Sequence, residues 1–294
     1  MKLFEKKFIL EKEKKSPTLV ALKITFFTFL VAIAVIWIFP FFLMINSSLK
    51  STSDFIFENV LKLAKIGQGA SQNYSNAYVA LNFWESFWIT LLITVLANFF
   101  IILFSSLAAW QLARNKKWYS KIIFYLFLIV MIVPFQAIML PLVSIMGKLH
   151  FMNIPGLIFM YTGFGMSLSI FMMHGFLNTI PVSLEEASKV EGYNPLRIYF
   201  KVIIPLLKPI ITTIVILNTM WIWNDFLLPY LIYQNNPNMP TTTVVKLFTS
   251  LVGTYGTDFK SLMAGLTILI IPVVIFFIFA QRNIVAGLTK GAIK

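Results

Sequence analysis

The sequence predicts an all-α, polytopic membrane protein with about six transmembrane helices, and three observations support this fold class. The chain has 294 residues, of which 59% are hydrophobic and only 12% are charged, whereas soluble domains carry about 25% charged residues. Several apolar runs are longer than about 18 residues, enough to cross a hydrocarbon core of about 30 Å. Most of the 24 Lys and Arg residues lie in alternate connecting segments, as they do in cytoplasmic loops.

The transmembrane domain is expected over residues 20–280, after a cytoplasmic tail of residues 1–19. The tail mixes Lys with Glu and has no apolar core of the kind found in a cleavable signal peptide, so the first span is expected to be an uncleaved anchor. Backbone groups that meet lipid must bond one another, so each span is expected to be helical. The expected spans are approximately residues 20–45, 84–112, 121–146, 154–177, 209–233 and 261–280.

The positive-inside rule then places both termini in the cytoplasm. External loops are expected at 46–83 and 234–260, a cytoplasmic loop at 178–208, and a cytoplasmic C-terminal tail at 281–294. A flexible turn is expected at 67–72 within the first external loop. The net charge of +13 follows from this topology and from attraction to anionic lipid, so it does not indicate nucleic-acid binding.

The cytoplasmic loop is too polar to span a bilayer, and its first half is expected to be a short helix. Ser183 and Glu186 have the S-x-x-E spacing of a capping box, which predicts that the helix starts one residue after the serine. Glu185 precedes Lys189 by four residues, the favourable order for an ion pair on one helix face. Gly192 is well placed to end this helix in a left-handed conformation.

The second half of the loop predicts another short helix. Asn194 and Pro195 have the residue types of an N-cap and a first helical position. Pro205 is expected to stop or kink this helix, because proline lacks a backbone N–H and clashes with the preceding turn. The loop is therefore expected to be helix, sharp turn and helix.

The fifth span contains a polar and aromatic cluster that we expect to line a solute pathway. Its acid, Asp225, lies about 24 Å from Pro209 along a helix that rises ~1.5 Å per residue. An intramembrane carboxylate faces the bundle interior or a water-filled cavity and is a functional candidate. Tryptophan faces suit a sugar ring, and Asn and Asp suit its hydroxyls. An interfacial Trp belt with its acid turned toward water explains the pattern equally well. The pathway candidates are Asn218, Trp221, Trp223, Asn224 and Asp225.

The sequence offers no expected catalytic, cofactor or metal site. It lacks the G-x-x-x-x-G-K-[ST] pattern of a P-loop and contains no cysteine. His150 and His174 are far apart and have no acid partners nearby, so neither a Ser/His/Asp triad nor a metal centre is predicted. We expect a non-enzymatic membrane subunit.

The cytoplasmic loop resembles the EAA loop of ABC importer permeases. The chain departs from the E-A-A-x-x-D-G pattern at two positions, with Ser188 for the second alanine and Glu191 for the aspartate. Taken without this resemblance, an ordinary amphipathic connector between membrane helices accounts for the same residues. The matching positions are Glu186-Ala187-Ser188, Gly192, Ile204-Pro205 and Pro209.

Further stretches are similar to carbohydrate-type permeases, in the expected order. They are a small-residue run ending in L-A-R at 105–114, Pro134 and Pro141 in the third span, W-N-D-F-x-x-P at 223–229, and Q-R-x-x-V-x-G-L-T-x-G-A-x-K at 281–294. The resemblance implies a permease subunit like the second permease of the maltose and multiple-sugar importers, in the inner membrane of a bacterial-type cell. The two prolines of the third span are also expected to kink their helix or free carbonyl groups.

The resemblance also implies partners and roles. The partners are a second permease, an ATPase dimer that binds ATP and Mg, an external solute-binding protein, a sugar solute and the lipid bilayer. This chain would form half of the solute pathway and couple to the ATPase through residues 181–209. The alternative is a self-contained secondary transporter or channel, which the lack of a recognisable repeat disfavours. The implied ATPase-coupling residues are Leu184, Glu186, Ala187, Ser188, Val190, Glu191, Gly192 and Pro205.

Overall fold

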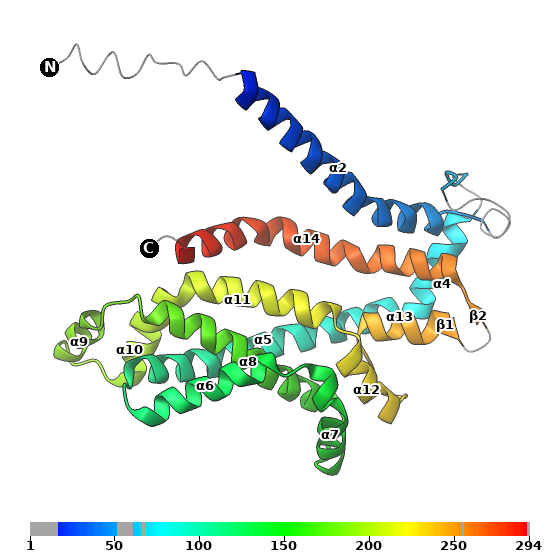
Figure 1. Cartoon of the computed structure of the whole chain (residues 1–294). Helices are drawn as coiled ribbons and strands as arrows, with labels where there is room; N and C mark the ends of the chain where they lie inside the picture. Colours follow the sequence, from blue (N-terminus) through cyan, green and yellow to red (C-terminus); the bar gives the residue numbers. More distant parts are fainter. Residues whose placement is uncertain (1–16, 52–60, 66–68, 254–255, 293–294) are drawn as a thin grey trace.

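The computed structural model describes residues 17–51, 61–65, 69–253 and 256–292, and the expected N-terminal tail lies almost wholly outside these ranges. The chain is an all-α bundle with one two-residue β-hairpin (Figure 1). Its elements are α2 (Pro17–Ser48), α4 (Ala70–Leu81), α5 (Phe83–Arg114), α6 (Trp118–Ile132), α7 (Phe135–Lys148), α8 (Ile154–Leu177), α9 (Ser183–Val190), α10 (Pro195–Ile198), the π-helix η1 (Tyr199–Ile203), α11 (Ile204–Asn224), α12 (Leu227–Asn235), α13 (Thr243–Leu251), β1 (Val252–Gly253), β2 (Gly256–Thr257) and α14 (Phe259–Ala292).

The expectation of about six spans is confirmed. Within the described ranges, five helical stretches are long and apolar enough to cross a membrane, and the bent pair α6–α7 supplies the sixth. Helices α9 and α10 lie at one end of the bundle, together with the junction of α5 and α6 and the C-terminal end of α14 (Figure 1). Helices α4 and α13 and the β-hairpin lie at the opposite end. The expected cytoplasmic loop and the two expected external loops therefore lie at opposite ends of the bundle.

The third span is not the single kinked helix expected at 121–146. It consists of α6 and α7, which meet at an angle of 105°. The break is at Pro134, and both this proline and Val133 before it have extended backbone. A residue that precedes proline is disfavoured in the α region, which explains the end of α6. Pro141, in contrast, lies inside α7.

The fifth span is also shifted from the expected 209–233. Its helical path begins at Pro195 and ends at Asn224, and α12 follows as a separate helix. Of the two outcomes expected at Pro205, a stop or a kink, the stop does not occur, because the helix continues through this residue. A π-helical segment comes directly before it, in which the Ile204 amide bonds the Tyr199 carbonyl five residues back. Such π-bulges absorb a local break in the ordinary helical bonding.

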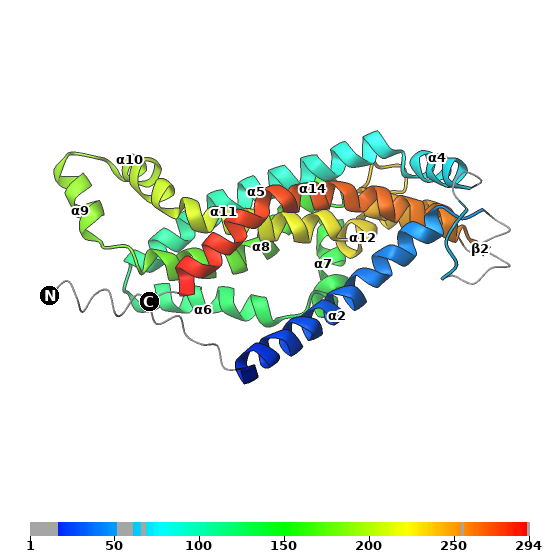
Figure 2. The same cartoon turned by 90° about the horizontal axis from the view of Figure 1, so that it is seen from above.

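The core of the bundle is formed mainly by α5 and α8, which pack along much of their length. Ile93, Ala97 and Ile101 of α5 are buried against Tyr161 of α8. The helices approach closely at Gly165, where any side-chain carbon would collide with Ile101. Helix α2 instead diverges from the bundle toward its N-terminal end (Figure 2), and its apolar side chains are mostly exposed.

Both external loops contain helices that the sequence analysis missed. The first contains α4, so residues 70–72 of the expected flexible turn are helical, while residues 67 and 68 lie outside the described residues. The second contains α13 and the hairpin in which Val252 pairs with Thr257. At the other end of the chain, α14 continues to Ala292, so the expected C-terminal tail is helical over most of its length.

Candidate functional site

Helix α9 has the expected position but a different start. It begins at Ser183, and no side chain caps its first turn. The amides of Leu184 and Glu186 donate instead to the carbonyls of Pro181 and Val182, at 3.4 and 3.1 Å. The capping box is therefore not formed, because a turn of backbone before the helix already satisfies these amide groups.

The turn after α9 is formed as predicted. Gly192 has a φ of 82°, in the left-handed region that glycine adopts without a steric penalty. Its amide donates to the Lys189 carbonyl and the next amide, of Tyr193, donates to the Ser188 carbonyl, both at 3.0 Å. These two bonds make a Schellman motif. The Asn194 side chain then accepts from the Arg197 amide at 2.8 Å, which confirms it as the N-cap of α10.

Helix α9 lies at the end of the bundle (Figures 1 and 2), and its outer face is apolar and exposed. Val190 is 90% exposed and Leu184 45% exposed, and Ala187 lies between them on the same face. Glu186 and Glu191 are also exposed. These five residues are therefore accessible to a partner, and their coupling role remains a prediction.

The inner face of α9 is polar and buried. The predicted pair between Glu185 and Lys189 is not formed within the described chain. The Glu185 carboxylate instead accepts from Arg114 Nε at 2.7 Å and from Trp110 Nε1 at 3.0 Å, both on α5. Ser188 also faces inward, and its hydroxyl donates to the Leu184 carbonyl at 2.9 Å. The Ser188 side chain is buried, so its predicted role in ATPase coupling would not involve direct contact with the ATPase.

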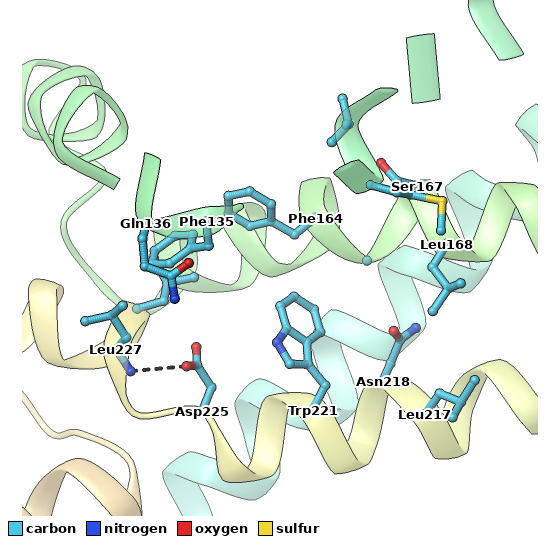
Figure 3. Close-up of a pocket in the computed structure, with 14 residues that line it drawn as sticks. Phe135, Gln136, Phe164, Ser167, Leu168, Leu217, Asn218, Trp221, Asp225 and Leu227 are labelled. Carbon is cyan, nitrogen blue, oxygen red and sulfur yellow. Dashed lines mark hydrogen bonds between the residues drawn. The ribbon is translucent and has the colours of Figure 1, made fainter. Parts of the chain in front are cut away.

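A cavity of about 460 Å³ lies between α6–α7, α8 and the C-terminal end of α11. Side chains from both sides point into it across the gap between α7, α8 and α11 (Figure 3). The aromatic residues at the cavity come from three helices, and four polar side chains lie beside them. They are Phe135, Phe164 and Trp221, with Gln136, Ser167, Asn218 and Asp225.

Asp225 is held within the protein and does not turn outward to water. It directly follows the last residue of α11. Its Oδ2 accepts from the Tyr161 hydroxyl at 2.8 Å, and its Oδ1 accepts from the Leu227 amide at 3.1 Å. The Tyr161 ring also packs edge-to-face on Trp221, with centroids 5.4 Å apart. The two pathway candidates are thus fixed by one buried tyrosine of α8.

The five predicted pathway residues do not lie together. Asn218, Trp221 and Asp225 line the cavity. Asn218 is buried, and its amide reaches the Ser169 hydroxyl at 3.4 Å. Trp223 lies on the opposite face of α11, in an apolar groove formed with α5 and α14. Asn224 is exposed and donates to the Met220 carbonyl of its own helix.

Sequence reasoning missed two polar residues that line the cavity, Gln136 and Ser167, and the tyrosine that binds Asp225, Tyr161. Tyr161 carries a hydroxyl deep in an apolar span, and such a group needs a hydrogen-bond partner when it is buried; this signal was present in the sequence. Gln136 was also recognisable in the sequence, because it is a polar residue that lies two positions after the helix break at Pro134. Ser167 is buried, and its hydroxyl has no hydrogen-bond partner in the described part of the chain. A small hydroxyl in a membrane helix is common, so nothing in the sequence singled it out.

Among the described residues, no group of three or more His, Asp or Glu side chains is placed to hold a metal ion. The His174 ring stacks on Phe124 with centroids 4.1 Å apart. His150 has a positive φ of 57° and follows the end of α7. The aromatic rings and the amide, hydroxyl and carboxylate groups at the cavity are of the kinds that contact hydroxylated solutes.

Comparison with known proteins adds the family context. The model of the family described as binding-protein-dependent transport system inner membrane component matches residues 101–290. The probable starch degradation products transport system permease protein AmyC of Thermoanaerobacterium thermosulfurigenes is 42% identical over 268 residues, covering 91% of this chain and 96% of the relative. The multiple sugar-binding transport system permease protein MsmG of Streptococcus mutans is 34% identical over 263 residues, 87% of this chain and 91% of the relative.

A solved structure shares the fold. It is the crystal structure of a bacterial ABC transporter involved in the import of the acidic polysaccharide alginate. One of its chains aligns with a TM-score of 0.78 at 22% identity, covering 91% of this chain and 98% of that chain. The likeness extends over nearly the whole bundle and concerns the fold.

Proposed function

The chain belongs to the family of binding-protein-dependent transport system inner membrane components, and on this basis we propose that it is a permease subunit of an ATP-driven importer of neutral oligosaccharides. Its working complex would contain a second permease, an ATPase dimer that binds ATP and Mg, and an external solute-binding protein, in a bacterial inner membrane. The chain itself would carry no cofactor.

One observation carries the coupling part of this proposal, namely the exposed apolar face of α9. Leu184, Ala187 and Val190 are exposed at one end of the helical bundle, and exposed apolar surface marks a site of protein contact. Glu186 beside them would pair with a basic residue of the ATPase. Because this short helix lies between two membrane-spanning stretches, a partner that moves it would also move the helices on either side.

The path from α9 to the cavity runs through one helical rod. After the turn at Gly192, the chain enters α10, η1 and α11 without a break in helical structure. The far part of α11 carries Asn218 and Trp221, and Asp225 directly follows this helix; all three residues line the cavity. ATP binding would close the ATPase dimer and displace α9, and the rod would shift its cavity residues between two states.

The residues that line the cavity support the assignment of a neutral, hydroxylated solute. Aromatic rings such as Trp221 suit the apolar faces of sugars, while Asn218 and Gln136 offer hydrogen bonds to hydroxyl groups. A fixed carboxylate at Asp225 disfavours an anionic solute at this position. The two relatives are named for the transport of starch degradation products and of multiple sugars, and we extend this class of solute to the present chain.

The proposal is tested by purifying the tagged chain from detergent-solubilised membranes and reconstituting what co-purifies. We expect an ATPase and a second permease to accompany it. In proteoliposomes with binding protein, labelled maltotriose, raffinose or arabinotriose should accumulate only with ATP, and an acidic trisaccharide should not.

The contrary outcome is equally clear. If the chain purifies alone and accumulates a sugar without ATP, it is a self-contained transporter and the importer proposal is wrong. If the complex forms and hydrolyses ATP but carries only the acidic sugar, the importer remains and the neutral-solute assignment is wrong.

A further inference from the structure

Helix α9 is attached to the membrane bundle through a charged contact. Within this helix only Glu185 and Ser188 are buried, and the serine hydroxyl bonds the helix's own backbone. Glu185 therefore makes the inward connection, with its carboxylate between Trp110 and Arg114 of α5. The proposed function does not use these two α5 residues, which come from the small-residue run that ends in L-A-R.

Arg114 also binds the segment before α9. Its Nη1 donates to the Leu177 carbonyl at 3.0 Å, and its Nη2 donates to the Ile180 carbonyl at 3.3 Å. The first carbonyl belongs to the last residue of α8, and the second lies in the linker to α9. One guanidinium therefore joins the end of α5, the end of α8 and the inner face of α9. Arginine suits this role because its planar fork presents several donors in fixed directions.

The same end of α5 also holds the start of the α11 rod. The Trp110 ring stacks on Tyr199 of η1 with centroids 5.9 Å apart. The Tyr199 hydroxyl lies 2.6 Å from the Ser106 hydroxyl, and both residues are buried. The two turns of α5 from Ser106 to Arg114 thus contact α9 and η1 together.

The pair is shielded enough to hold its geometry. The Arg114 side chain is 16% exposed and the Glu185 side chain 6% exposed. Exposed ion pairs contribute little because water and side-chain entropy offset them. A buried pair behaves differently, because removal of one partner leaves an uncompensated charge. Removal of either charge should therefore weaken the contact between α9 and α5, because the remaining charge stays buried without its partner.

We propose that Arg114 and Glu185 form a coupling clamp, which makes α9 move as one body with the cytoplasmic ends of α5 and α8. This inference rests on the proposed function. The clamp delivers a displacement of α9 to the α5–α8 pair, whose tight contact at Gly165 keeps the two helices together. Helix α8 carries Phe164 and Ser167 on one wall of the cavity, while α11 carries the facing wall. One movement of α9 thus reaches both walls.

Both clamp residues are positioning residues, because neither lies at the cavity or on the exposed face of α9. Their loss should separate ATP hydrolysis from transport without preventing assembly. A merely structural role would lower both activities in proportion to the amount of intact complex. The ratio of sugar accumulated to ATP hydrolysed distinguishes these two cases, since it does not depend on how much complex is recovered.

The test uses the complete reconstituted complex and the same sugar panel. Arg114→Gln and Glu185→Gln remove one charge each, and the swapped pair Arg114→Glu with Glu185→Arg restores opposite charges. Lys116→Gln is the matched control, because it removes a charge from an exposed residue at the same end of α5. We expect each single variant to assemble and hydrolyse ATP, with sugar transported per ATP lowered roughly tenfold, a typical size for coupling between sites.

The swapped pair should regain only part of this ratio, because a carboxylate at position 114 cannot donate to the carbonyls of Leu177 and Ile180. The control should match the wild type. A ratio that stays at the wild-type value in both single variants overturns the clamp, as does a swapped pair that assembles without any recovery. Failure of the proposed function is seen separately, as absence of ATP-dependent uptake in the wild-type complex.

Discussion

The two ends of the helical rod formed by α10, η1 and α11 differ in what they expose. At the α9 end, apolar Leu184 and Val190 face water, and the charge of Glu185 is buried in an ion pair. At the cavity end, the polar groups Asn218 and Asp225 face a space inside the membrane bundle. Apolar side chains are usually removed from water, and polar side chains are usually absent from the interior of a membrane bundle. Each end of the rod therefore departs from the usual distribution.

This difference indicates two kinds of recognition. Exposed apolar surface on a short helix favours a protein partner, because contact removes it from water. Polar groups in a membrane cavity favour a small hydroxylated solute, because they are already held by neighbours such as Tyr161 and need no rearrangement to bind. One rigid rod connects the two sites, so the comparison can be tested by disturbing each end separately.

Among substitutions that disturb the rod or the cavity, the largest effect is expected at the turn that joins α9 to the rod. Gly192→Val forces a branched side chain into a left-handed backbone at a φ of 82°, which costs about 1–2 kcal/mol or more. Such a cost shifts a two-state population roughly 5- to 30-fold, and uptake should fall by a similar factor. ATP-dependent uptake by the reconstituted complex measures it.

Gly192→Asn is the matched control, because asparagine enters the left-handed region more readily than other residues with a side chain. No atom lies within 4 Å of the added side-chain carbon, so crowding does not confuse the comparison. Equal loss in both variants would show that the backbone conformation is not the reason for the effect.

A smaller effect is expected at the cavity. Asp225→Asn keeps the shape of the side chain but replaces a charge-assisted bond from Tyr161 with a neutral one. The difference is about 1 kcal/mol, so the KM of sugar uptake should rise about fivefold while the ATPase still co-purifies. Asn224→Gln changes the neighbouring exposed residue and should leave the KM unchanged. An unchanged KM in Asp225→Asn would remove this carboxylate from the solute pathway.

Local sequence spacing predicted the turn after α9 well and its start poorly. Gly192 and Asn194 act through bonds to residues three to five positions away, so their types and spacing are sufficient. Ser183 had the same kind of signal. Its capping box competed with a preceding turn of backbone whose carbonyls satisfy the same amides, and a motif of four residues does not distinguish these two solutions.

The positions of the prolines predicted where helices could break or kink, but not which proline would have the larger effect. Pro134 ends a helix and bends the chain by 105°, Pro141 lies within a helix, and Pro205 follows a π-helical segment. The three residues have the same local chemistry. Packing of the surrounding helices determines which helix breaks, and this information is spread over distant parts of the chain.

The cavity was predictable only in part for the same reason. The type of residue identified Asn218, Trp221 and Asp225, but rotation about α11 sends Trp223 to the opposite groove. The partners of Glu185 and Asp225 lie on α5 and α8, 71 and 64 positions away in the sequence. A single sequence gives the residues that need partners, whereas the fold gives the partners themselves.

The central claim is that the exposed face of α9 binds an ATPase, and co-purification with Glu186→Lys tests it most directly. Reversal of a charge in a protein interface costs about 2–5 kcal/mol, so the ATPase should be lost from the purified variant while the second permease remains. Lys116→Glu, an exposed charge reversal at the same end of the bundle but outside α9, should retain both partners. If Glu186→Lys retains the ATPase at the wild-type level, α9 does not bind it through this face.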